Sequence, residues 1–281
     1  MPRLTRLAVV GHRGDFGTCV PTQGLQDLEI AWVERPVEPD PERLRRSVEQ
    51  LRPDAVIVLE PQAGEGELLA GSAPVIAAWL VANWGSGPST TPLAGFDRVL
   101  AACPGAARRA AGHDVWRIQP PPVDDACFAD VRPAGSPARV FFDGPTSAGR
   151  DALLQPTKHN FDLLHLAGGA GLQRLSELHQ RSDIALDLAE EPGVTPRDRV
   201  GTALAAGLLV VAQRPFERPG LAAGTHVVTF GELWELHDLL VAIRMHPDAF
   251  RSMRVRGRRF AESLRASVVL PQLTRDLVNG A

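Results

Sequence analysis

The chain has 281 residues, a formal net charge of −3 and a hydrophobic fraction of 44%. This length favours two domains, and the hydrophobic fraction excludes a chain too polar to form a core. The charge excludes a global basic field for nucleic acid or anionic lipid, so such binding would need a local patch.

The first half of the chain alternates short apolar runs with amphipathic segments, which is typical of βαβ units and a parallel sheet. Helical spacing of apolar residues, with charges on the opposite face, predicts a helix over 41–51. A shorter helix is expected over 104–111. Strands are predicted over 6–11, 28–33, 54–59, 74–80, 97–102 and 115–118.

A domain boundary is predicted where two proline-rich breaks follow each other, at 119–125 and 132–137. Successive prolines remove hydrogen-bond donors and hold the chain extended, so these segments cannot be helical. We expect a first domain over residues 1–122 and a second over 137–281.

The second half restarts the same alternation. Strands are predicted over 139–142, 161–166, 183–188, 208–212 and 226–230. Helices are predicted over 148–159, 172–181, 199–206, 233–245, 248–264 and 273–278, the first of them broken or ended by Pro156. The fold class is therefore α/β, with two Rossmann-like domains whose parallel sheets face a cleft. Ligands of such sheets bind beyond the carboxyl ends of the strands.

Three widely spaced cysteines argue against a disulfide framework, and the absence of a Cys-x-x-Cys pair argues against structural zinc. The N-terminal apolar run is too short for a signal-peptide core, and no later run reaches the length of a membrane span. We expect a soluble protein of the reducing cytoplasm with no metal site.

From residue 161 onward, an ordered series of segments resembles the donor domain of GT-B glycosyltransferases. The segments are 161–169, 178–188, 199–211, 224–230, 233–240 and 247–258. The resemblance is closest to the group called CgeB-like or glycosyltransferase family 1-like. The first half resembles the acceptor domain more weakly, through 96–101 and 110–128, and is shorter than that domain usually is.

The resemblance implies metal-independent transfer of a sugar from a nucleotide-sugar to an unknown acceptor, with no other cofactor. Such sites offset the charge of the diphosphate with cationic side chains and helix N-termini. The resemblance places the donor near Gly144, Arg150, Lys158, Gly168 and Arg199. The alternative for Arg150 is an ordinary surface arginine.

One departure from the family pattern affects the donor site. Where the family has a glutamate for the ribose hydroxyls, this chain has Thr202, which lacks the charge and reach of a carboxylate. Glu190 or Glu191, in the loop expected to face the donor sugar, can substitute for it, or they belong to a solvated acidic loop. Alternatively, the donor binds differently or activity has been lost.

The loop after the first strand contains His12 and Asp15. Either can act as the general base that deprotonates the acceptor hydroxyl, and a histidine titrates near neutral pH. The alternative is a turn with a solvated histidine and a capping aspartate.

Further along the chain, Arg251, Arg254 and Arg258 have helical spacing and form either a surface for anionic lipid or nucleic acid or a solvated face. The second hypothesis for the whole chain is a non-catalytic GT-B-like protein that binds a nucleotide or sugar. A third is a sugar-nucleotide epimerase.

Overall fold

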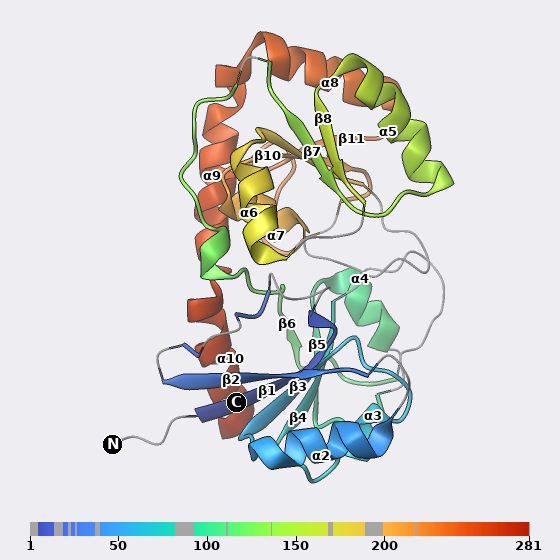
Figure 1. Ribbon diagram of the computed structural model, residues 1–281, viewed down its shortest axis with the longest axis vertical. Coiled ribbons are helices and arrows are strands. Elements are labelled where there is room, and N and C mark those ends of the chain that lie inside the picture. The colour runs from blue at the N-terminus through green and yellow to red at the C-terminus, as the bar shows by residue number, and fades with distance from the viewer. Residues whose placement is uncertain are drawn as a thin grey trace. The chain divides into compact units, whose positions relative to one another are not determined.

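We describe a computed structural model of the chain (Figure 1). The residues that the structure describes are 5–13, 19–21, 24–25, 27–36, 40–81, 93–110, 112–135, 137–167, 171–188, 199–216 and 218–280. The chain divides into two compact units. The first comprises Met1–Pro122, Thr195–Arg197 and Arg265–Ala281, and the second comprises Val123–Val194 and Asp198–Leu264.

The described part of the first unit contains a six-stranded parallel sheet with the order β2-β1-β3-β4-β5-β6. Its strands are β1 (Thr5–Gly11), β2 (Leu28–Glu34), β3 (Ala55–Leu59), β4 (Ile76–Leu80), β5 (Arg98–Ala101) and β6 (Arg117–Ile118). Its helices are α2 (Pro41–Leu51), α3 (Glu65–Leu69), α4 (Pro104–Ala107), the 3-10 helix η1 (Arg108–Ala110) and α10 (Ala266–Asn279).

Alternate residues of the buried strands of this sheet serve two cores. Leu7 and Val9 of β1 point to the face covered by α10, whereas Ala8 and Val10 pack with Leu44 of α2 on the other face. Strands buried on both faces read as continuous apolar runs, which is why these segments could be recognised in the sequence.

The last helix belongs to the first unit. Ala266, Leu270, Leu273 and Leu277 of α10 are buried against its sheet, and Arg117 of β6 forms an ion pair of 2.8 Å with Asp276. The compact units therefore differ from the predicted ranges, because residues 265–281 are grouped with the first unit. The predicted helix over 273–278 was also too short, since α10 continues through Pro271.

The described part of the second unit contains a five-stranded parallel sheet with the order β11-β10-β9-β7-β8. Its strands are β7 (Val140–Asp143), β8 (Leu163–Leu166), β9 (Ile184–Asp187), β10 (Leu209–Gln213) and β11 (Val228–Phe230). Its helices are η2 (Asp125–Cys127), α5 (Ala148–Asn160), α6 (Leu172–Gln180), α7 (Arg199–Ala205), α8 (Leu233–Met245), η3 (Pro247–Phe250) and α9 (Arg251–Glu262).

Helices cover both faces of this second sheet (Figure 1). On one face, Phe142 of β7 packs with Leu154 of α5 and Leu240 of α8. On the other face, Val210 of β10 packs with helices α7 and α9. The two parallel sheets, each with helices packed against it, confirm the predicted α/β class.

Pro156 does not break its helix, contrary to the sequence-based prediction. Helix α5 runs from Ala148 to Asn160, and hydrogen bonds formed by side chains support it around the proline. The Thr157 hydroxyl donates to the Leu153 carbonyl at 2.7 Å, and the Asn160 amide donates to the Pro156 carbonyl at 2.9 Å. A proline removes its own N–H and its ring crowds the carbonyl four residues earlier, and these contacts help to continue the helix around it.

The three cysteines are buried free thiols. Burial raises the pKa of the Cys127 thiol to about 12, helped by the neighbouring Asp124 and Asp125 carboxylates, so this thiol stays protonated. Among the described residues, no helix combines the length and apolarity that crossing a membrane requires.

Candidate functional site

A short turn in the second unit joins strand β7 to helix α5. We call residues Gly144–Ser147 the β7–α5 turn. The Ser147 hydroxyl caps the helix by accepting from the Arg150 N–H at 3.2 Å, and the Gly144 N–H donates to the Leu166 carbonyl of β8 at 2.9 Å. The turn therefore lies at the carboxyl edge of the sheet, where ligands of such sheets bind.

Two arginines gather over one buried ring beside this turn. The guanidinium carbons of Arg150 and Arg199 lie 5.8 Å and 5.9 Å from the centre of the Phe142 ring, within cation–π range. Arg150 is only 2% exposed, and its Nη1 donates to the Pro145 carbonyl at 3.2 Å. The alternative that Arg150 is an ordinary surface arginine is therefore wrong.

Gly144 allows this approach of Arg199 to the main chain. A Cβ at Gly144 would lie 3.1 Å from Nη2 of Arg199 and 3.0 Å from Cζ of Phe142. Both distances are tighter than ordinary carbon contacts. A residue larger than glycine would push the guanidinium away from the turn.

Thr202 occupies a different environment from the one expected for a ligand contact. It is 2% exposed, and its hydroxyl donates to the Arg199 carbonyl at 3.0 Å within the first turn of α7. The threonine therefore supports the helix that carries Arg199.

Lys158, predicted to lie near the donor, lies beside an imidazole. Its Nζ is 3.2 Å from Nδ1 of His165, and Nε2 of His165 is 2.8 Å from the Gly144 carbonyl oxygen. No role was predicted for His165 from the sequence. The pairing of β7 with β8, which places His165 opposite Phe142, brings it to the turn.

In the first unit, His12 follows the end of β1, and the parallel register places Gly11 opposite Glu34 of β2. Nδ1 of His12 lies 3.6 Å from Oε1 of Glu34, and the same oxygen accepts from the Arg13 N–H at 3.2 Å. His12 is thus partly exposed beside a carboxylate that can orient its ring.

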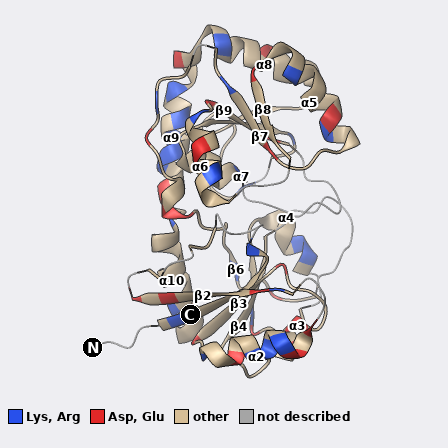
Figure 2. Ribbon diagram, viewed as in Figure 1, with Lys and Arg blue, Asp and Glu red and all other residues tan. Residues whose placement is uncertain are grey.

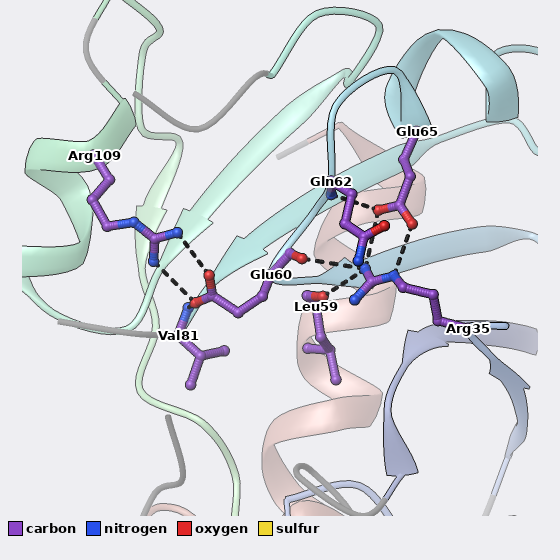
Figure 3. A network of polar contacts seen from close by, with 7 residues as sticks. All are labelled: Arg35, Leu59, Glu60, Gln62, Glu65, Val81 and Arg109. Atoms are coloured by element: carbon purple, nitrogen blue, oxygen red, sulfur yellow. Dashed lines mark hydrogen bonds and ion pairs between the residues drawn. The ribbon is translucent and has the colours of Figure 1, made fainter. Parts of the chain in front are cut away.

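A polar network holds the carboxyl end of β3 in the first unit (Figure 3). Arg35 donates to both carboxylate oxygens of Glu65, at 2.8 Å and 3.0 Å, and to the Leu59 and Glu60 carbonyls. Arg109 donates to both carboxylate oxygens of Glu60, at 3.1 Å and 2.8 Å. Glu60 has a φ of 46°, a left-handed conformation that costs a non-glycine residue energy.

A cavity of about 290 Å³ adjoins this network. Its lining is mixed, with Arg35, Asp40, Gln62 and Glu65 beside apolar groups such as Leu44. The volume is at the lower end of what small-molecule sites have.

The predicted basic stripe is not a free surface. Figure 2 shows cationic residues along α9. However, Arg254 is 4% exposed and donates to the Gly207 carbonyl at 2.9 Å. Arg258 lies over Phe128 and donates to the Ala129 carbonyl at 2.8 Å. Two of the three arginines therefore anchor α9 to its own unit, which rules out the lipid or nucleic-acid surface formed by all three.

Four predicted site residues lie outside the described residues. They are Asp15, Gly168, Glu190 and Glu191. Within the ranges described above, no group of three His, Cys, Asp or Glu side chains is placed to hold a metal ion.

Sequence comparison and structure comparison give different answers for this chain. No protein-family model and no curated protein sequence matches it. Solved structures do match along nearly the whole chain. The structure of AviGT4, a glycosyltransferase involved in avilamycin A biosynthesis, is 16% identical with a TM-score of 0.58, and the match covers 99% of both chains.

Two further matches have higher TM-scores. Anabaena HepE in complex with UDP-glucose is 11% identical with a TM-score of 0.64, covering 98% of this chain and 100% of HepE. Sucrose-phosphate synthase from Thermosynechococcus elongatus is 12% identical with a TM-score of 0.63, covering 99% of this chain and 100% of that one. The chain has the fold of GT-B glycosyltransferases.

Proposed function

We propose that this chain is a metal-independent glycosyltransferase that takes a sugar from a nucleotide-sugar. The observation that supports this most directly is the pair of arginines, Arg150 and Arg199, over Phe142 at the β7–α5 turn. HepE, which shares the fold, has been solved with UDP-glucose. A diphosphate is the part of such a donor that needs concentrated positive charge.

In this proposal, the turn and Arg199 stabilise the diphosphate as it leaves. Charge develops there as the bond to the sugar breaks, so fixed cations and N–H groups lower the barrier. His12 is the base that takes the proton of the acceptor hydroxyl, and Glu34 orients its ring. Asp15 is the alternative base, and Gly168, Glu190 and Glu191 complete the donor-binding residues.

The proposal is tested by titrating the protein with UDP-, GDP- and dTDP-sugars in a calorimeter. We expect one base to be preferred, with a dissociation constant in the micromolar range that is common for enzyme substrates, about 1 μM to 1 mM. Binding of none of these donors would contradict the proposal.

A second candidate function is a non-catalytic protein that binds a nucleotide or a nucleotide-sugar. Thr202 favours it, because the hydroxyl that replaces the expected carboxylate donates to a main-chain carbonyl. Donor binding without sugar transfer and without donor hydrolysis, measured by release of nucleoside diphosphate, would support this candidate over the enzyme.

A further inference from the structure

We infer that His165 is a positioning residue of the donor site. It fixes the β7–α5 turn so that carbonyl oxygens point inward and a main-chain N–H points toward the ligand. The inference rests on the proposed function, because the ligand of the turn is taken to be the diphosphate of a nucleotide-sugar.

The carbonyl oxygens of this turn would weaken anion binding if they faced the ligand. A carbonyl oxygen carries partial negative charge and repels phosphate, whereas an N–H attracts it. The peptide between Gly144 and Pro145 offers only a carbonyl, because proline has no N–H. Unless it is held elsewhere, the Gly144 oxygen can face the ligand.

His165 holds that oxygen. A carbonyl only accepts, so the 2.8 Å contact requires a proton on Nε2 of His165. In the neutral ring, Nδ1 then carries a lone pair, and it can accept from the Lys158 ammonium 3.2 Å away. One tautomer satisfies both contacts, so Lys158 selects the form of His165 that binds the turn.

Arg150 holds the carbonyl oxygen of the next peptide, between Pro145 and Thr146, as His165 holds that of Gly144. Its Nη1 donates to the Pro145 carbonyl at 3.2 Å, and Arg150 is 2% exposed. Among the described residues, the Arg214–Pro215 peptide is the only cis one, so the Pro145–Thr146 peptide is trans. In a trans peptide the N–H points opposite to the carbonyl. The Thr146 N–H therefore points away from the buried guanidinium, and Thr146 itself is exposed.

The ring of His165 also lies beside the Phe142 ring, over which both arginines lie. It lies 5.2 Å from the Phe142 ring at an angle of 46°, and Phe142 carries both guanidinium groups. His165 thus joins the two parts of the site: the turn, and the ring on which Arg150 and Arg199 lie.

Three variants separate the hydrogen bond from packing. Glutamine places its amide nitrogen near the position of Nε2 and can still donate to Gly144, whereas asparagine is too short and leucine has no donor. The probe is UDP, GDP or dTDP, whichever the wild-type protein binds most tightly by calorimetry. We expect H165L and H165N to raise the Kd of this nucleotide roughly tenfold and H165Q to change it less than about threefold. A tenfold rise corresponds to the loss of about one hydrogen bond that holds the turn.

The outcomes separate the two proposals. If the wild-type protein binds no nucleoside diphosphate, the proposed function and this inference both fall. If it binds one and H165N binds equally well, the proposed function stands and the inference is overturned. Equal weakening of H165Q and H165N, with equal losses in melting temperature, also overturns the inference, because it indicates packing of the ring. If H165L does not fold, H165N and H165Q decide.

Discussion

At the carboxyl edge of the first sheet, Arg35 and Arg109 each bond both oxygens of a carboxylate. At the same edge of the second sheet, Arg150 bonds a main-chain carbonyl and lies with Arg199 over Phe142. Arg35 and Arg150 are buried to a similar extent, at 5% and 2% exposed. Burial of an arginine therefore does not by itself indicate a ligand.

The difference lies in what each guanidinium organises. A bidentate pair with a carboxylate is directional, and it cross-links β2, β3 and α3 in the first unit. In the second unit the arginines organise a turn at the start of a helix, where an anion is stabilised. Substitution at the first edge should therefore affect folding, and substitution at the second should affect binding.

The largest expected effect is on the first edge. Glu65→Ala removes both carboxylate contacts of Arg35 and the acceptor of the Gln62 N–H, and leaves a buried cation. The free energy of unfolding should fall by about 3–5 kcal/mol, as measured by chemical denaturation. Glu177→Ala, which breaks an exposed pair with Arg174, is the matched control and should change stability little. A loss under about 1 kcal/mol for Glu65→Ala would contradict the structural role.

The second effect concerns pH and a buried ring in the second unit. Burial lowers the pKa of His179 to about 4, so the folded protein keeps this ring neutral while the unfolded chain protonates it near pH 6.5. The unfolded state binds more protons between these values, so stability should be lost as pH falls from 6.5 to 4, by up to about 3 kcal/mol.

Unfolding at a series of pH values compares the wild-type protein with His179→Gln. The variant should be less stable at pH 8 and should have a shallower pH dependence between pH 6.5 and 4. Parallel curves for the two proteins would show that His179 does not stay neutral in the fold.

The third effect tests the second edge. Arg199→Ala should weaken binding of the preferred nucleotide-sugar about 100-fold and reduce transfer at least as much, because one preorganised charge contact has this size. The melting temperature should change little, since Arg199 lies at the first position of α7. Calorimetry and a melting curve measure both quantities, with Arg174→Ala as the surface control. If the Arg199→Ala variant loses stability but keeps its affinity for the nucleotide-sugar, then Arg199 stabilises the fold, as Arg35 and Arg109 do, and does not bind the donor.

The smallest effect is at Gly144. Alanine there would meet Arg199 and Phe142 at about 3 Å, so the guanidinium must shift by a few tenths of an ångström. We expect roughly tenfold weaker nucleotide binding in calorimetry, since small displacements at a charged site cost about this much. Unchanged affinity would mean that the close approach of Arg199 to the turn has no role in binding.

The sequence predicted the elements of both sheets because their strands are continuous apolar runs. The order of motifs also placed Gly144, Arg150 and Arg199 near one donor, and the structure brings the two arginines together beside the turn that holds Gly144. The full length of α10 was readable too, since Ala266, Leu270, Leu273 and Leu277 have helical spacing. The predicted helix nevertheless covered only 273–278, the part of α10 that follows Pro271.

The role of His165 was not readable. It depends on which strand lies beside β7, and alternation of apolar and amphipathic segments does not give strand order. The left-handed conformation of Glu60 also could not be predicted from the sequence. No local sequence signal marks a left-handed glutamate, and this one is held by Arg109, 49 residues away.

The central claim is that the β7–α5 turn holds the diphosphate of a sugar donor. A crystal structure of the protein with a bound nucleoside diphosphate tests it most directly. The account predicts phosphate oxygens within hydrogen-bond distance of the Thr146 N–H and the Arg199 guanidinium, with the Gly144 oxygen still on His165. A diphosphate bound away from this turn, or a Gly144 carbonyl rotated toward the phosphate, would contradict it.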